Sequence, residues 1–465
     1  MSQQHYIYVH VNDISTIFNG NMLKRFNSIW VNLRVNLKHF YLTNHQNQNS
    51  NPETNFSCSK LLLHPTMSDI PREIVAEFLS RVPAQPLLRL RCVSKSWREI
   101  IDSPDFIKLH LNRALQTNSD RKLILRSTFV YVADFDELEQ TNTAVYTALD
   151  LPYKRSAFGN DILGSCHGLL CLDTTGDEDR MVLWNPTTHK CHRFPYPEFE
   201  NLGESAICIW CLVFGFGYDK VSDDYKVLRI FQSHECQSEA KVYSLKSNSW
   251  RKIPCFPYCL KYKRANGVLV AGALHWAVCR TPQLYMENLI GAFDLGTEEY
   301  RLVPEPNYSE GALYVTVGVL GESLCVVCNY YDSSYVDIWV MKSYGVKESW
   351  TKLFTVTESD LSGKPLEFVT PLAFSMSGRE VFMVVNGKQP LWYDIEQRKI
   401  RDSAFRIDSV PAIMVHQMCF GSLVRTDGGV GRVVDVTEGE GSGGSNGRNH
   451  KKRDEFLSEG FRLIL

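Results

Sequence analysis

The 465-residue chain holds 52 acidic and 50 basic side chains and has a formal net charge of −2 at pH 7. Because nucleic-acid phosphates are held by clusters of Lys and Arg, a chain this balanced, with no basic stripe, is not expected to bind nucleic acid. Its apolar runs fall short of the roughly 18 residues that a membrane-spanning helix requires, so we also expect no membrane segment.

Residues 1–66 differ in character from everything that follows them. They are rich in Asn, contain only Asp13 and Glu53 as acids, and keep neither helical nor strand periodicity for long. They also lack the charged start, apolar core and cleavage site of a secretory signal, so we expect the protein in the cytoplasm and nucleus. We interpret residues 1–66 as a disordered or spurious leader and Met67 as the natural start.

Residues 67–111 carry the start and stop signals of three short helices. Pro71 suits an opening helical turn, and Val82–Pro83 and Ser103–Pro104 are typical of helix ends. Apolar residues recur at helical spacing between these signals, which predicts one buried side for each helix. Three helices of this size cannot cover their own apolar surface well, so the segment is predicted to dock onto a partner.

The same residues resemble an F-box in its plant form. The matching pieces, in order, are Ile70–Pro71, Leu79–Pro83 (LSRVP) and Arg91–Trp97 (RCVSKSW). The resemblance implies that apolar residues of this segment dock onto a Skp-type adaptor, which connects to a cullin scaffold and a ubiquitin-conjugating enzyme. Some of these residues could instead pack the helices against one another, and Trp97 is expected to do so. Carried over residue by residue, the adaptor-binding set is Ile70, Pro71, Ile74, Val82, Pro83, Leu87 and Leu88.

After a linker at 112–120, residues 121–425 change to short β-branched and aromatic runs broken by Gly, Asn, Asp and Pro, which predicts an all-β domain. Five loosely repeated passes of strand, turn and strand can be read within it. An aromatic residue anchors each pass, at intervals of roughly fifty residues. These anchors are Trp184, Tyr243, Phe293, Trp339 and Tyr393.

A repeat of this length favours a β-propeller of about six blades, in which each sheet buries its faces against its neighbours. Residues 123–135 and 144–149 precede the first pass, and residues 412–424 follow the last. We expect them to complete the ring by joining both chain ends in one sheet, which hides exposed edges. A stacked β-sandwich is the alternative. The predicted fold class is thus multidomain α+β, with a small three-helix F-box followed by an all-β propeller-like domain.

Several pieces of this region are also similar to the F-box-associated domain found downstream of plant F-boxes. Their roles look structural, with Gly where strands turn and Asp or Asn within turns. The pieces are 164–170 (GSCHGLL), 183–186 (LWNP), 215–219 (GFGYD), 224–227 (DYKV) and 272–276 (GALHW).

The residues that could act in catalysis or bind a metal show no spacing typical of an active site or a metal site. The 14 cysteines are scattered, which predicts reduced thiols in a chain without a secretory signal. The Cys-x-x-Cys pairs Cys208/Cys211 and Cys325/Cys328 lie in strand-like runs, where residues three apart point to opposite faces and cannot share a zinc ion. Cys166–His167 would diverge in a strand for the same reason. We predict no catalytic residue, metal or cofactor.

Residues 426–449 are Gly-rich and are predicted to be a mobile tether, whereas 450–465 return to amphipathic character and form a predicted C-terminal docking segment. This ending and the order of motifs before it resemble plant F-box proteins that restrain defence. The resemblance implies intracellular immune receptors of the nucleotide-binding leucine-rich-repeat type as targets.

The sequence therefore predicts a non-catalytic substrate-recognition subunit of a Skp–cullin–F-box ubiquitin ligase. The helices would bind the adaptor and the β domain would hold a protein substrate for ubiquitination and proteasomal degradation, through residues that the sequence does not identify. Two alternatives stay open: an adaptor-binding scaffold or decoy without ligase output, and a carbohydrate-binding propeller.

Overall fold

The computed structural model describes residues 71–427 except 127–129, 144, 153–160, 175–179, 198–208, 234–235, 264, 282–286, 309–311, 331–333, 362–364, 388 and 403–413. The predicted leader, the C-terminal docking segment and almost all of the Gly-rich tether lie outside this part. Among the residues that the structure describes, no helix has both the length and the apolar character that a membrane span needs.

The first described elements are helices α3 (Arg72–Leu79), α4 (Ala84–Leu90), α5 (Lys95–Ile101) and α6 (Pro104–Thr117). The predicted set of three omits α6, and residues 112–117 belong to this helix rather than to a linker. The reason is that Ser103–Pro104 ends one helix and also begins the next. Ser103 Oγ accepts a hydrogen bond from Phe106 N at 3.3 Å, and Pro104 occupies the first helical turn.

Apart from helix α7 (Phe135–Thr141) and one 3-10 helix, the regular structure of the remaining described chain forms six antiparallel sheets, which confirms the predicted propeller. The inner strand of each sheet contacts those of its two neighbours, and these contacts run round a closed ring. Blade 1 contains β4 (Asp161–Cys166), β5 (Leu169–Asp173), β6 (Arg180–Asn185) and β7 (Lys190–Pro195). Blade 2 contains β8 (Ile209–Asp219), β9 (Asp224–Ser233), β10 (Ser238–Ser244) and β11 (Ser249–Ile253). Blade 3 contains β12 (Cys259–Leu260), β13 (Val268–Val270), β14 (Ala273–Cys279), β15 (Leu289–Asp294) and β16 (Tyr300–Val303). Blade 4 contains β17 (Ala312–Leu320), β18 (Ser323–Tyr330), β19 (Tyr335–Met341) and β20 (Trp350–Thr357). Blade 5 contains β21 (Val369–Phe374), β22 (Glu380–Val385), β23 (Gln389–Asp394) and β24 (Lys399–Asp402).

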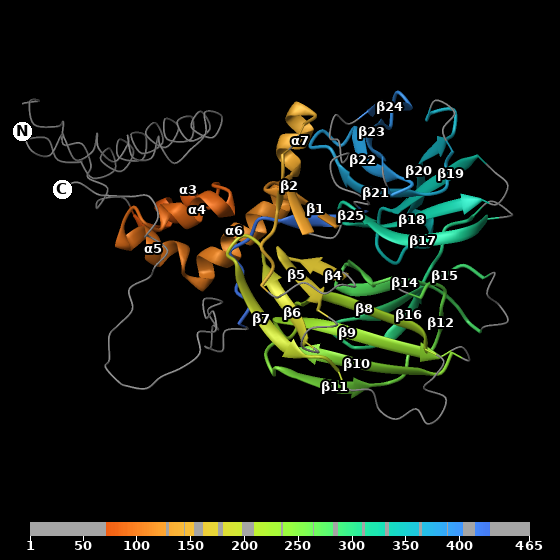
Figure 1. Ribbon diagram of the computed structural model, residues 1–465, viewed down its shortest axis with the longest axis horizontal. Coiled ribbons are helices and arrows are strands. Elements are labelled where there is room, and N and C mark those ends of the chain that lie inside the picture. The colour runs from red at the N-terminus through yellow and green to blue at the C-terminus, as the bar shows by residue number, and fades with distance from the viewer. Residues whose placement is uncertain are drawn as a thin grey trace, which may run out of the picture. The chain divides into compact units, whose positions relative to one another are not determined.

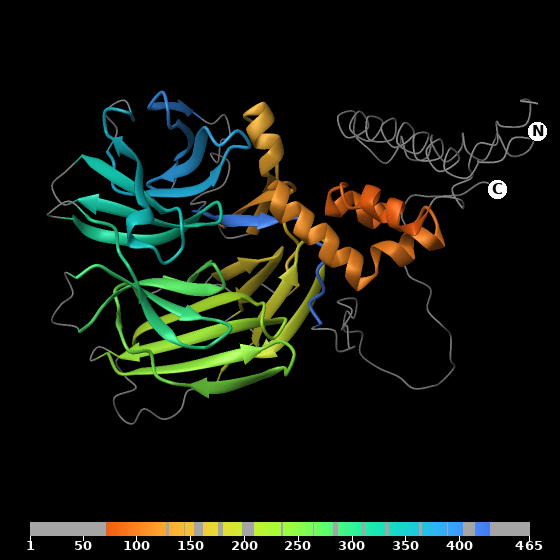
Figure 2. The ribbon, with the colours of Figure 1, turned by 180° about the vertical axis from the view of Figure 1, so that it is seen from behind.

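The sixth sheet, the closing blade, joins the two ends of the β domain as predicted. It contains β25 (Met414–Phe420), β1 (Arg121–Arg126), β2 (Val130–Asp134) and β3 (Tyr146–Ala148), in that order. Strands β25 and β1, from opposite ends of the colour scale, lie side by side in Figures 1 and 2, with Arg121 opposite Phe420. Backbone pairing between the chain ends therefore closes the ring.

Four of the five aromatic anchors read from the sequence occupy equivalent places on the third strand of their blades, counting blade 3 along the path β12-β14-β15-β16. In blade 4 the equivalent residue is Met341, two residues after Trp339. Trp184, Tyr243, Phe293 and Tyr393 are buried, whereas Trp339 is partly exposed beneath Lys352, whose Nζ lies 5.6 Å from the ring centroid. The fifty-residue period thus reflects one large side chain per blade on the same strand, at the same position in four of the five blades.

The turns between third and fourth strands also repeat. Asn185, Asp294 and Asp394 each accept hydrogen bonds from the backbone N–H groups two and three residues later, an arrangement that stabilises tight turns. In antiparallel blades these turns lie on the same face as the turns between first and second strands. We call this the short-turn face; helix α6 leads into β1 at this face.

A second repeated contact links consecutive blades and was not predicted. An aromatic residue at the start of an outer strand, its first or second residue, donates a side-chain hydrogen bond to the carbonyl of a proline that ends or follows the outer strand of the preceding blade. Trp250 Nε1 bonds Pro195 O at 2.8 Å, Tyr300 Oη bonds Pro254 O at 2.8 Å, and Trp350 Nε1 bonds Pro304 O at 2.7 Å. These bonds fasten blades 1 to 4 in sequence.

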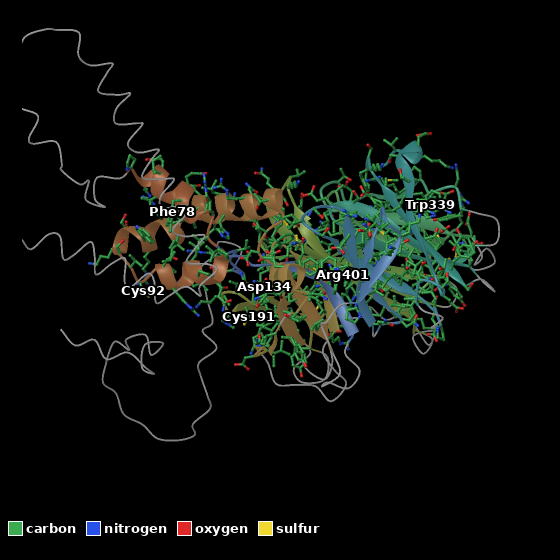
Figure 3. All side chains as sticks on the ribbon, turned by 90° about the horizontal axis from the view of Figure 1, so that it is seen from above. Phe78, Cys92, Asp134, Cys191, Trp339 and Arg401 are labelled. Carbon is green, nitrogen blue, oxygen red and sulfur yellow. A yellow bond between two sulfur atoms is a disulfide. The ribbon has the colours of Figure 1, made fainter. Side chains whose placement is uncertain are left out.

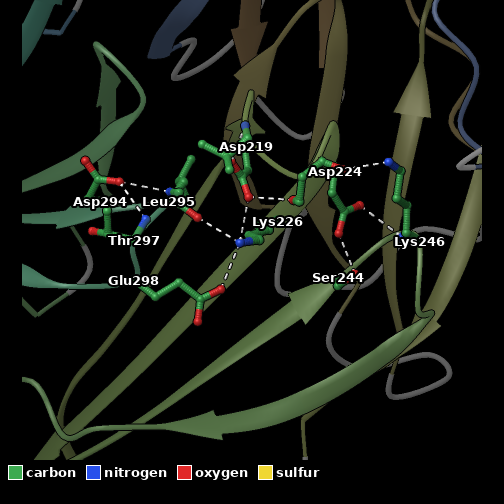
Figure 4. Close-up of polar contacts among 12 residues, drawn as sticks. Asp219, Asp224, Lys226, Ser244, Lys246, Asp294, Leu295, Thr297 and Glu298 are labelled. Carbon is green, nitrogen blue, oxygen red and sulfur yellow. Dashed lines mark hydrogen bonds and ion pairs between the residues drawn. The ribbon is translucent and has the colours of Figure 1, made fainter.

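A nearly buried lysine adds a polar link between blades 2 and 3 (Figure 4). Lys226 Nζ lies 2.9 Å from Asp219 Oδ2 and 2.8 Å from Glu298 Oε1, and donates to Leu295 O at 2.7 Å. Burial lowers the pKa of Lys226, but the hydrogen bonds to Glu298 and Asp219 outweigh this effect. The pKa of Lys226 is therefore raised above its usual value. The ammonium therefore stays charged and connects two turns of the short-turn face.

The cysteines correct one prediction. Cys236 and Cys259 form a disulfide between the β9–β10 hairpin of blade 2 and strand β12 of blade 3, so not all thiols are reduced. The pair is far apart in sequence, and spacing alone does not reveal it. Cys325 and Cys328 pack into different hydrophobic clusters on the two faces of β18, as expected for residues three apart in a strand.

We predict that Arg121→Met lowers the free energy of unfolding by about 3 kcal/mol, since it leaves two partly buried carboxylates without their partner. Arg121 is 2% exposed; it bonds Asp136 at 2.8 Å, Glu139, and the Phe374 carbonyl of blade 5 at 2.8 Å. The control is Arg379→Met, whose exposed pair with Asp394 is expected to contribute much less. Urea unfolding followed by Trp fluorescence measures both, and equal losses would contradict the closing role of Arg121.

Candidate functional site

The helical segment, α3 to α6, has a compact core of its own. Its buried residues come from all four helices and include Phe78, labelled in Figure 3 together with the exposed Cys92. Trp97 is 5% exposed and lies in this core, as expected. The other buried core residues on the helices and their connections are Val75, Leu79, Val82, Ala84, Leu87, Leu90, Ile100, Ile101 and Phe106.

The predicted adaptor-binding residues separate into two groups. Pro71 and Ile74, one turn apart at the start of α3, are exposed, and Ile74 keeps 37% of its surface open. Pro83 and Leu88, at the start and middle of α4, are partly buried. These four residues remain candidates for contact with an adaptor, while Ile70 lies outside the described residues.

Val82 and Leu87 correct the predicted set. They are 6% and 0% exposed and pack inside the helical core, so their surface is not available to a partner. A hydrophobic residue in a short helix can face either inward or outward, and the choice depends on the other helices. The sequence motif alone therefore could not separate these two residues from Ile74.

Ion pairs fasten the helices around this core. Glu77 of α3 lies 2.8 Å from Arg113 of α6 and 2.8 Å from Arg81. Hydrogen bonds from Arg113 and then Arg81 hold the pKa of Glu77 below its usual value. Arg91 bonds Asp102 at 2.8 Å across the other end of the segment. Such pairs orient the helices and leave the apolar start of α3 exposed.

The chain following the closing strand also enters the helical core. Leu423, 6% exposed, belongs to the same cluster as Phe78 and Trp97. Asn185 of blade 1 is completely buried and its Nδ2 donates to the carbonyls of Ser422 at 3.0 Å and Val424 at 2.9 Å. We call residues 421–425 the strap, because they contact both the propeller and the helices.

Asp120 is the polar centre of this junction. Its Oδ2 accepts a hydrogen bond from Ala84 N, at the start of α4, at 2.9 Å, and its carbonyl accepts one from Gly421 N at 2.8 Å. A Cβ on Gly421 would lie 2.0 Å from Asp120 Oδ2, so this position requires glycine. Sequence analysis missed the strap and Asp120, because both act through contacts distant in sequence.

Helix α6 packs on the short-turn face of blades 1 and 2. Its Leu111 shares a cluster with Cys166 and Phe216. Lys108 Nζ lies 3.7 Å from Asp223 Oδ2 in the β8–β9 turn. Burial raises the pKa of Cys166 to about 12, the opposite of what a nucleophilic thiolate requires, and the adjacent His167 Nδ1 lies 3.1 Å from Tyr225 Oη. This former candidate dyad therefore belongs to the junction's packing.

Comparison with known proteins identifies the two parts. The F-box domain model matches residues 67–109, and the model described as the F-box associated beta propeller domain matches residues 123–424. The chain belongs to the family of F-box proteins that carry an F-box-associated β-propeller domain.

Among curated proteins, it is 35% identical to the F-box protein CPR1 of Arabidopsis thaliana over 86% of this chain and 100% of that protein. It is 30% identical to the F-box protein At4g22390 of Arabidopsis thaliana, again over 86% of this chain and 100% of that protein. Among solved structures, an oligogalacturonate lyase from Vibrio parahaemolyticus matches with a TM-score of 0.34 at 10% identity, covering 60% of this chain and 78% of that chain, which is too distant to bear on function.

We predict that acid destabilises the helical junction through His110 of α6. His110 Nε2 lies 2.8 Å from the Val82 carbonyl, whereas its Nδ1 is buried without a hydrogen-bond partner. Burial lowers the pKa of His110, whereas the Val82 carbonyl and then Asp120 partly offset this effect and Arg113 adds to it. Because the folded pKa lies below the unfolded value near 6.5, this contribution is present above about pH 6.5 and is lost as the pH falls towards the folded pKa.

Thermal unfolding of the full chain at about pH 7 and about pH 5.5 measures this effect. The fall in midpoint should be smaller for His110→Gln, which keeps a donor for Val82 O but does not titrate. An identical fall in both proteins would show that other groups carry the pH dependence.

Proposed function

We propose that this protein is the substrate-recognition subunit of a Skp–cullin–F-box ubiquitin ligase. The observation that supports this most is that the helical segment has a filled core but an exposed apolar start. Its core is complete without a partner, since it is filled by its own residues and Leu423, yet Pro71 and Ile74 remain exposed at the start of α3. An exposed apolar pair on a rigid unit fits a docking surface for a Skp-type adaptor, which in turn binds the cullin scaffold.

In this role the propeller binds a protein substrate and the protein itself does no chemistry. Its contribution is proximity, because a substrate held in the complex meets the ubiquitin-conjugating enzyme at a raised effective concentration. Ubiquitination then leads to proteasomal degradation. We place this activity in the cytoplasm and nucleus, where the adaptor and the proteasome operate.

We further propose that the substrate is an immune receptor of the nucleotide-binding leucine-rich-repeat type, so that the protein restrains plant defence. Support comes from the motif order shared with defence-restraining plant F-box proteins and from the identity of 35% with the F-box protein CPR1 over the whole of that relative. Loss of the protein would then raise the level of such receptors.

We predict that Ile74→Glu weakens adaptor binding by at least about 30-fold, because truncating or charging a central apolar anchor commonly costs about 2 kcal/mol or more. The matched control is Leu109→Glu on α6, since Leu109 is 39% exposed and Ile74 is 37% exposed. Calorimetric titration of the full chain with a Skp-type adaptor measures both Kd values.

Equal binding by wild type and Ile74→Glu would remove the assigned surface. The same pair of variants, expressed in plant cells with and without proteasome inhibitor, tests the ligase role. Wild type and Leu109→Glu should shorten the lifetime of a nucleotide-binding leucine-rich-repeat receptor, while Ile74→Glu should not. Adaptor binding without any effect on lifetimes would instead indicate a scaffold or decoy.

A further inference from the structure

Two connections on the short-turn face are longer than the turns of the other blades. One is residues 135–145 of the closing blade, which contain helix α7 (Phe135–Thr141), and the other is in blade 4. In blades 1, 2, 3 and 5 the third and fourth strands are joined by short turns at residues 186–189, 245–248, 295–299 and 395–398. In blade 4 the corresponding connection is residues 342–349, which we call the blade-4 loop, and it contains a short 3-10 helix at Lys347–Ser349. Insertions in one unit of a repeat often lie on the binding face.

The blade-4 loop is held in one conformation by its own hydrogen bonds. Ser349 Oγ donates to Ser343 O at 2.8 Å or to Val346 O at 2.7 Å, and accepts from Ser343 N at 3.1 Å. Backbone bonds from Val346 N to Ser343 O and from Lys342 N to Ser349 O close it further. A loop fixed in this way loses little conformational entropy when it binds a partner.

Tyr344 fastens the loop to the neighbouring blade. Its hydroxyl lies 2.6 Å from Nε2 of His275, a completely buried residue of β14, and accepts a hydrogen bond from Arg301 Nη2 of β16 at 2.9 Å. The Arg301 guanidinium also lies 5.1 Å from the centroid of the Tyr344 ring. The loop is thus supported from blade 3 as well as by its own blade.

The tip of this supported loop exposes an apolar residue between two positive charges. Val346 is 46% exposed, and Lys342 and Lys347 are both exposed. Among the residues that the structure describes, neither lysine has a carboxylate partner, whereas Lys352 on the adjoining strand is paired with Asp337 at 2.8 Å. Glu348 is the one acid of the loop. The loop therefore combines fixed geometry, an apolar contact and unpaired positive charge.

We propose that the blade-4 loop is a docking element for an acidic segment of the protein substrate. Carboxylates of the segment would pair with Lys342 and Lys347, and an apolar side chain would pack on Val346. The inference rests on the proposed function, since it names part of the surface by which the propeller holds its substrate. The loop lies on the short-turn face, where the helical segment also joins the propeller, so the substrate would bind on the adaptor's side of the ring.

The test uses the full chain bound to a Skp-type adaptor and a fluorescein-labelled peptide of alternating Glu and Val, with binding measured by fluorescence anisotropy. Lys342→Glu/Lys347→Glu should weaken binding by about tenfold or more, because like charges then face each other. The matched control is Arg398→Glu/Lys399→Glu, which makes the same charge change at the ordinary turn of blade 5, where both residues are exposed. The control should bind within about twofold of wild type.

Two further variants separate the parts of the site. Val346→Ser should weaken binding several-fold by removing the apolar contact, and Tyr344→Phe should do so by releasing the loop from His275 and Arg301. Raising the salt concentration should weaken binding of the wild type and have little effect on the doubly reversed variant.

The outcomes distinguish this inference from the proposed function. If the wild type captures the adaptor but does not bind the peptide, or if both charge reversals weaken binding equally, the docking role of the loop is overturned and the ligase role stands. If the peptide binds through the loop but the chain captures no adaptor, the ligase role fails while the loop inference survives.

Discussion

The backbone pairing of β25 with β1 is the contact on which the rest of this structure depends. It joins the last strand of the β domain to the first, so that a row of six sheets becomes a ring without free inner edges. Arg121, the first residue of β1, links the closing blade to blade 5, because its guanidinium donates a hydrogen bond to the Phe374 carbonyl. Without this pairing, both terminal strands would expose unpaired backbone groups.

The same closure positions the helices. Directly after β25 the chain forms the strap, which places Leu423 in the helical core, and directly before β1 it forms the turn at Asp120, which bonds the start of α4. The helical segment is therefore attached to the ring by the chain that follows α6 and by the strap rather than by one flexible connection. For a receptor that must present a bound substrate to a separate enzyme, such attachment limits the positions that the substrate can take.

Much of this architecture was predictable because it repeats or follows a local motif. The F-box pieces between Ile70 and Trp97 and the aromatic anchor in each of five blades are local signals, and the expected pairing of chain ends follows from the need to cover sheet edges. Features that depend on contacts distant in sequence were not predictable. Examples are the burial of Val82 and Leu87, the insertion of Leu423, and the disulfide between Cys236 and Cys259. The blade-4 loop gives no signal in the sequence, since its greater length becomes visible only beside the shorter turns of blades 1, 2, 3 and 5.

Hydrogen exchange of the full chain, measured by mass spectrometry with and without a Skp-type adaptor, tests the central claim most directly. The account holds that the start of α3 is an open surface on an already folded unit. It predicts that the adaptor slows exchange in peptides covering residues 71–90 and leaves β1 and β25 unchanged. No added protection in residues 71–90, or protection confined to the propeller strands, would contradict the account.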